Sequence, residues 1–88
     1  MEKTVFRIEK MGGSADEQMV RMKLSEIRDI EWMEFDLRNR QLAVYHYGNI
    51  SAIQSALDSL DLGARQIAHE AGFSLDRAMG RNQRSEGS

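Results

Sequence analysis

The spacing of apolar residues switches between two periods along this chain, and the order of the switches constrains the fold more than any other feature. A two-residue alternation is typical of half-buried strands, and a three- and four-residue spacing is typical of an amphipathic helix. The predicted elements are a strand at 3–10, a helix from 15, a strand at 30–37, a strand from 42, a helix from 50 and a strand at 64–70. The predicted order is therefore β-α-β-β-α-β.

Each predicted element presents one apolar face, except the final strand at 64–70, whose pattern is weaker. In the first two strands the core-facing residues are expected to be Thr4, Phe6, Ile8, Met33, Phe35 and Leu37. The opposite face of these strands is expected to carry Val5, Arg7, Glu9, Trp32, Glu34 and Asp36. On the helices the predicted buried stripes are Ala15, Met19, Met22 and Ile27, with Val20 nearby, and then Ile50, Ile53, Ala56, Leu57 and Leu60. Met is a common gap-filler in cores, so Met33 and the two helical methionines are assigned there.

Short polar or glycine-containing segments separate the elements. The connection "RNRQ" at 38–41 is short enough to join two strands as a hairpin. Gly63 is predicted to be the C′ glycine of the second helix, and Ser74 is predicted to cap a short turn through Met79. A single antiparallel four-stranded sheet with both helices on one face buries all of these stripes. The predicted fold is therefore α+β and ferredoxin-like.

Composition excludes several functional classes. The 88 residues, 41% hydrophobic and 30% charged, are typical of one soluble globular domain. The absence of cysteine excludes disulfides, thiolate catalysis, iron–sulfur clusters and cysteine-ligated zinc or copper(I). A net charge of −2 argues against nucleic-acid binding. No apolar run approaches the ~20 residues of a membrane span, and the N-terminus lacks a signal-peptide pattern, so we expect a cytoplasmic location and no membrane insertion by this segment.

The strand "TVFRIEKM", the small-residue loop after it, and the later segments "MEFDLRNRQLAVYHYGN" and "IQSALDSLDLGA" together resemble the heavy-metal-associated domain family. The resemblance covers about residues 3–70, so we divide the chain into a domain at 1–70 and a flexible tail or linker at 71–88. It implies the fold of copper and mercury chaperones and of the N-terminal modules of cation transporters. The family's metal motif is Met-x-Cys-x-x-Cys, and here the matching window is Met11 to Asp16, with Gly13 and Asp16 at the cysteine positions.

Two interpretations of this loop follow from the residues. In the first, Ser14 caps the helix and Glu17 completes a capping box, while Asp16 and Glu17 lie near the positive end of the helix dipole and Glu17 pairs with Arg21. In the second, Ser14, Asp16 and Glu17 ligate a divalent metal through oxygen atoms. The family resemblance implies that Met11 packs in the core beneath the loop. Soft-metal binding through thiolates cannot be carried over from the family.

The remaining chemistry-bearing residues lie away from the loop. His46 and His69 are expected at the opposite end of the sheet, ~20 Å from Asp16 by strand rise, as ordinary residues of the rim two strands apart. Trp32 and Tyr45 are expected on the open face of the sheet, as a contact surface for a protein partner or a second copy. No RNA-binding signature accompanies these aromatics.

The sequence contains no nucleophile–base pair, phosphate loop or metalloprotease motif, so we expect no enzymatic activity. The functional interpretation is a non-catalytic heavy-metal-associated-type module, such as the N-terminal regulatory or docking domain of a cation transporter, with a transporter membrane domain or another protein as its partner and no certain cofactor. The alternatives are a divalent-metal binder using oxygen ligands near Asp16 and a small-ligand regulatory domain of similar topology.

Overall fold

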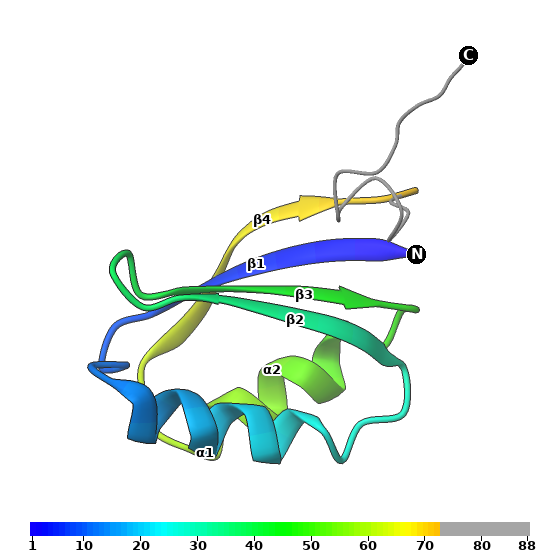
Figure 1. Ribbon diagram of the computed structural model, residues 1–88. Coiled ribbons are helices and arrows are strands. Elements are labelled where there is room, and N and C mark those ends of the chain that lie inside the picture. The colour runs from blue at the N-terminus through cyan, green and yellow to red at the C-terminus, as the bar shows by residue number, and fades with distance from the viewer. Residues whose placement is uncertain (73–88) are drawn as a thin grey trace.

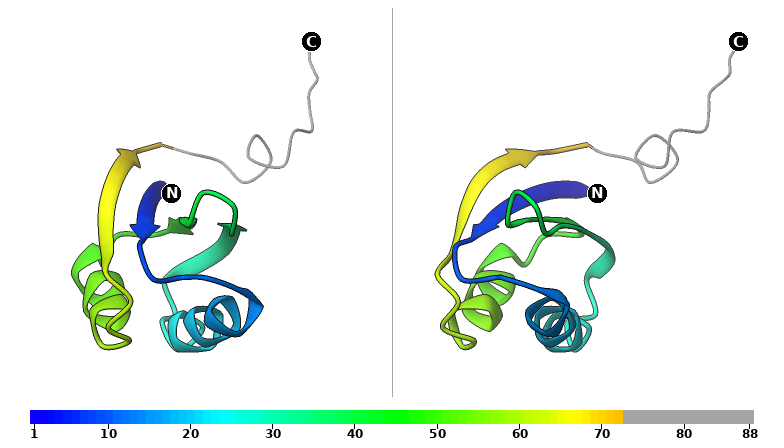
Figure 2. Two further views of the ribbon diagram at one scale, coloured as in Figure 1. Left: turned by 90° about the vertical axis from the view of Figure 1, so that its left-hand side faces the viewer. Right: turned by 60° about the vertical axis from the view of Figure 1, so that its left-hand side comes forward.

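The computed structural model describes residues 1–72 and contains four strands and two helices in the predicted order (Figure 1). The elements are β1 (Glu2–Ile8), α1 (Ser14–Leu24), β2 (Ile30–Asp36), β3 (Gln41–His46), α2 (Ile50–Asp58) and β4 (Ala64–Glu70). The strands form one antiparallel sheet in the order β2-β3-β1-β4. Both helices cover the same face of this sheet, and the other face carries no helix of the described residues (Figure 2). The ferredoxin-like prediction is confirmed.

The core lies between the sheet and the two helices. The fully buried apolar residues are Phe6, Ile8, Met11, Val20, Leu24, Leu42, Val44, Ile53 and Leu57. Met33, Phe35 and Leu37 pack against this cluster from β2 and the turn after it, as the alternating pattern predicts. The facing assigned to β1 is also confirmed, because Thr4, Phe6 and Ile8 are all buried.

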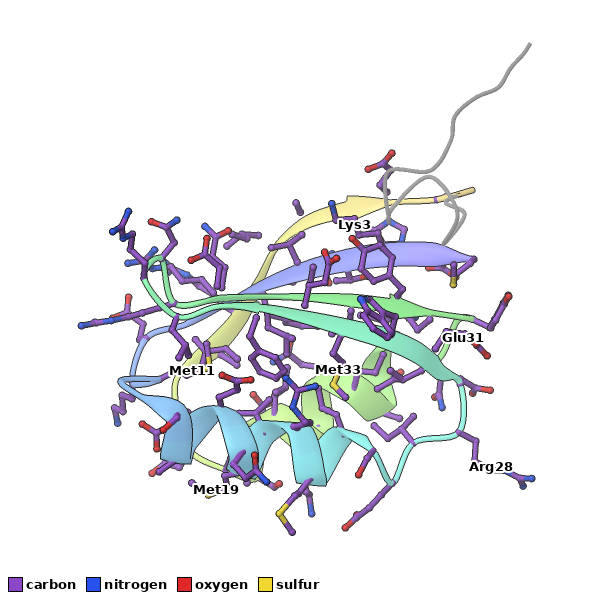
Figure 3. All side chains as sticks on the ribbon, in the orientation of Figure 1. Lys3, Met11, Met19, Arg28, Glu31 and Met33 are labelled. Carbon is purple, nitrogen blue, oxygen red and sulfur yellow. The ribbon has the colours of Figure 1, made fainter. Side chains whose placement is uncertain are left out.

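The predicted buried stripe is wrong within α1, whereas its last member, Ile27, lies beyond the helix and does pack against the core. Met19 and Met22 are 43% and 64% exposed, whereas Val20 and Leu24 are buried. Figure 3 shows Met19 on the side of α1 that faces away from the sheet. Successive helical residues are about 100° apart, so the true stripe is the predicted one rotated by one residue. The β-branched Val20 and the compact Leu24 fill the space against the sheet.

Two predicted helix boundaries are also wrong. Ser14 is the first residue of α1 rather than its cap; Gly13 takes the N-cap position and no side chain bonds there as a cap. The second helix ends at Asp58, so Gly63 is not its C′ residue. Gly63 instead adopts a positive φ of 71° directly before β4, where a Cβ would lie 3.3 Å from the Cβ of Glu9. This close approach explains the glycine.

The C-terminal predictions are only partly covered by the structure. The turn predicted from Ser74 to Met79 lies outside the described residues. The last strand ends at Glu70, and the division into 1–70 and 71–88 stays a prediction. Within residues 1–72, neither helix has the length and apolar content that crossing a bilayer requires.

Candidate functional site at the loop before α1

The loop between β1 and α1 is held together by its own residues. Met11 is fully buried, as predicted, and its backbone N–H donates to the carbonyl of Ile8 at 3.1 Å. The N–H of Gly12 donates to Asp16 Oδ2 at 3.0 Å. Asp16 is the third residue of the helix, so this contact resembles the acidic half of a capping box, shifted one residue outward. The loop is therefore hydrogen-bonded to the first turn of α1.

Two of the three predicted oxygen ligands already have partners within the protein. Asp16 bonds to Gly12, and Glu17 Oε2 forms an ion pair with Arg21 at 2.7 Å. Ser14 is exposed. Among residues 1–72 no group of three or more His, Cys, Asp or Glu side chains is arranged to hold a metal ion. The oxygen site stays a prediction.

The donor set of this loop does not fit a soft metal ion. Such ions select thiolate ligands, and neither Gly13 nor Asp16 supplies a thiol. The sulfur-containing side chain of Met11 is enclosed in the core rather than presented to the loop surface. Gly13, by contrast, has open space where a Cβ would be, and its φ of −172° is an extended conformation that any residue adopts. The backbone geometry at this position is therefore compatible with a ligand side chain that the sequence does not provide.

At the opposite end of the sheet, His46 is fully buried, and the prediction of a rim residue is wrong for it. Its Nδ1 lies 2.6 Å from the carbonyl oxygen of Gly48, and its Nε2 lies 2.8 Å from Thr4 Oγ1. A carbonyl oxygen only accepts, so Nδ1 carries the proton. In the neutral ring Nε2 is then an acceptor, and the Thr4 hydroxyl donates to it. This pair has a structural role that the sequence pattern did not reveal.

His69 and Glu2 form a second contact beside this pair. Glu2 Oε1 lies 2.8 Å from His69 Nε2, and Glu2 Oε2 accepts the N–H of Gly48 at 3.1 Å. The hydrogen bond from His69 is the main reason that the pKa of Glu2 is lowered. The two histidines lie two strands apart, as predicted, because β3 and β4 are the strands on either side of β1. Both ring nitrogens of His46 are bonded within the protein, to Thr4 and Gly48. Of the two, only His69 is exposed, as a rim residue would be.

On the open face of the sheet, the two predicted interface aromatics differ in accessibility. Trp32 is 41% exposed, but its register partner Tyr45 is only 1% exposed. The Tyr45 hydroxyl donates to Glu34 Oε1 at 3.0 Å, and Lys3 Nζ lies 5.7 Å from the ring centroid. Burial, together with Glu34, raises the pKa of Tyr45 to about 12. The predicted interface stays a prediction, with Trp32 as its accessible member.

Two surface hollows flank β2, and sequence reasoning missed both. The first, of about 670 Å³, lies on the open face; it is lined by Lys3, Val5, Glu34, Phe35, Asp36, Leu37, Gln41 and Ala43. The second, of about 390 Å³, lies between the end of α1 and β2; it is lined by Arg21, Ser25, Ile27, Ile30, Glu31, Trp32 and Met33. Residues of β1, β2 and β3 and of the turn after β2 line the first hollow, whereas residues of α1, the loop after it and β2 line the second. No single segment therefore carries a sequence signal for either.

Comparison with known proteins identifies the fold. No family model matches the sequence, and a sequence search of curated proteins gives no match. Among solved structures, the crystal structure of oxidized MerP from Ralstonia metallidurans CH34 superposes with a TM-score of 0.69 at 12% identity. The alignment covers 77% of this chain and 100% of that chain. At this identity the likeness establishes the architecture alone: this chain has the ferredoxin-like fold of MerP, as its resemblance to heavy-metal-associated domains predicts.

Proposed function

We propose that this chain is a non-catalytic, heavy-metal-associated-type module that acts by docking to another protein, as a cytoplasmic regulatory or docking domain of a cation transporter. The MerP-like fold and the order of the sequence segments support the family comparison. The observation that carries the proposal is the loop before α1: Asp16 bonds back to Gly12, and neither family cysteine position holds a thiol. The scaffold is retained while the soft-metal ligands are replaced.

The surface of the described residues supports a binding role. Trp32 exposes much of its ring on β2, and large aromatic side chains contribute disproportionately to protein–protein binding. Three of the polar groups best placed for chemistry, on Glu2, His46 and Tyr45, are each bonded to neighbouring residues. These hydrogen bonds support a structural role for the three side chains, and not a catalytic one.

In-cell photocrosslinking tests the docking role. A photoreactive p-benzoylphenylalanine would replace Trp32 in one variant and Ile67, which is 45% exposed on the other edge strand, in the control. After irradiation of cells that produce the protein, we expect the Trp32 variant to yield adducts containing peptides of a cation transporter. Equal adducts from both variants, or adducts without transporter peptides, would contradict the proposal.

A second candidate function is divalent-metal binding through Ser14, Asp16 and Glu17. The observation that favours it is the placement of both carboxylates in the first turn of α1, next to an exposed hydroxyl. Binding would require Asp16 and Glu17 to release Gly12 and Arg21. Titration with zinc, cobalt or cadmium should then shift the backbone amides of residues 11–17, and Asp16→Asn should abolish the shifts. Unchanged loop amides at millimolar metal would rule this candidate out.

A further inference from the structure

We propose that the free edge of β2 accepts an added strand from the partner protein, and that this strand alternates basic and apolar residues. The inference rests on the docking role proposed above and specifies its surface and the chemistry of the partner. Three features of β2 carry it: its position in the sheet, its charge, and the two hollows beside it.

In the described sheet, β2 is an edge strand. It pairs with β3 alone, and the strand order β2-β3-β1-β4 leaves its other side without a partner among residues 1–72. An edge strand presents N–H and C=O groups that another strand can pair with. Strand addition of this kind takes its affinity from the backbone and its specificity from alternate side chains.

The charge of β2 has one sign. Its sequence, IEWMEFD, contains Glu31, Glu34 and Asp36 and no cation, and Asp29 precedes it. Hydrogen bonds from Asn39 lower the pKa of Asp36, which keeps that carboxylate ionised. Like charges directly opposite each other destabilise paired strands. A second copy of β2 would therefore be repelled, and a strand carrying Lys or Arg would be attracted.

The cations near this edge lie outside the strand itself. Arg28 and Arg38 lie beyond the two ends of the strand. Arg21, on the side of α1, is paired with Glu17 at 2.7 Å, and its guanidinium lies over the ring of Phe35. The other edge strand, β4, carries both signs, with one arginine and one glutamate in ARQIAHE. Charge therefore distinguishes the two edges.

The hollows predict which side chains the partner strand presents to each face. On the helix-side face the hollow has an apolar part that suits an apolar side chain, formed by Ile27, Ile30, Trp32 and Met33. Its polar lining consists of Arg21, Ser25 and Glu31. On the open face Glu34 and Asp36 line the hollow together with Lys3 of β1. The two carboxylates outnumber the one cation, so the hollow suits a further Lys or Arg side chain. Successive residues of a strand point to opposite faces, so the two requirements alternate along the partner. Trp32, which is 41% exposed, is the apolar anchor at the helix-side hollow.

The peptide Lys-Val-Lys-Val-Lys-Val-Lys tests this inference on the purified chain. We expect it to shift the amide resonances of residues 29–37, to slow hydrogen exchange at amides of β2, and to bind more weakly as salt rises. Two peptide controls should not bind: one with Glu in place of every Lys, and one with Pro in place of the central Val, which removes a backbone donor. Equal binding by either control would overturn the proposal.

Variants of the protein locate the contact. Replacing both Glu31 and Glu34 by Gln should weaken peptide binding about three- to tenfold at low salt, and Trp32→Ala should weaken it about tenfold or more. The matched controls are Asp58→Asn with Asp61→Asn, which removes the same charge near α2, and Ile67→Ala on β4; both should leave affinity within about twofold. Amide shifts on β4 in place of β2, or no shifts at millimolar peptide, would overturn the proposal.

The failure of this inference is separable from failure of the docking role. If the Trp32 crosslinker captures a transporter while the basic peptide leaves β2 unchanged, the partner docks without adding a strand. If neither occurs, the docking role itself is wrong. Both results contradict the strand-addition proposal, and only the second contradicts the function.

Discussion

Replacing Thr4 by Val tests the hydrogen bond that holds buried His46. Valine has nearly the shape of threonine, so packing is retained while the hydroxyl that donates to His46 Nε2 is lost. The ring nitrogen then has no donor in a fully buried position. Leaving a buried acceptor unsatisfied costs about 1–3 kcal/mol of unfolding free energy. In a domain of this size each kcal/mol lowers Tm by roughly 4–8 °C, so a decrease of roughly 5–20 °C is expected.

The assay is urea unfolding followed by the fluorescence of Trp32, the single tryptophan of the chain. The midpoint should fall while the slope of free energy against urea stays unchanged. The control is the same substitution in a His46→Leu background, where no ring nitrogen needs a donor and Thr4→Val should cost little. An unfolding free energy for Thr4→Val within about 0.5 kcal/mol of the parent protein would refute the reasoning.

Three further predictions concern the core, a turn and a buried phenol. Leu24→Ala should lower the unfolding free energy by about 2–5 kcal/mol, measured by urea unfolding, and Met22→Ala, at an exposed site, by less than about 1 kcal/mol; equal losses would contradict the observed face of α1. Gly63→Ala should lower the unfolding free energy by about 1–2 kcal/mol, and Tm with it, because residue 63 has a positive φ and lies close to Glu9. Gly13→Ala should add no strain, so similar Tm values for the two variants would contradict this prediction. Because the folded pKa of Tyr45 is raised to about 12 from 10.0, its contribution to stability is present below pH 10 and is lost between pH 10 and 12. A tyrosinate absorbance step near pH 12 that disappears in Tyr45→Phe should confirm this, and a step at pH 10 assigned to the same residue would contradict it.

The sequence predicted the fold well because one face of β1, β2 and β3 packs against a common core. Alternation in 30–37 identified β2, and its apolar face does pack on the cluster. The buried face of α1 was predicted wrongly because Met19, Met22 and Val20 are all apolar, and apolar spacing alone does not distinguish them. Which of them faces the sheet depends on shape and on the angle at which the helix packs, and neither is encoded locally.

The candidate site was predictable in position and not in detail. The strand-to-helix junction predicted the position of the loop, yet the helix begins at Ser14 and Asp16, instead of Ser14, accepts a loop N–H, from Gly12. The burial of His46 depends on Thr4, which is 42 residues away in the sequence. No pattern within a single segment carries such long-range information.

The central proposal is that the loop before α1 occupies the position of the metal loop of heavy-metal-associated domains but lacks its thiolate ligands. Measuring soft-metal binding before and after two cysteines are introduced tests this proposal most directly. Gly13→Cys fits the open space at that residue, and Asp16→Cys supplies the second thiol while removing the bond to Gly12. In cadmium titrations followed by thiolate charge-transfer absorbance and loop amide shifts, the parent protein should show neither signal. The double variant should bind one ion per chain through both sulfurs. Absence of binding in the double variant, or shifts of the loop amides in the parent protein, would contradict the account.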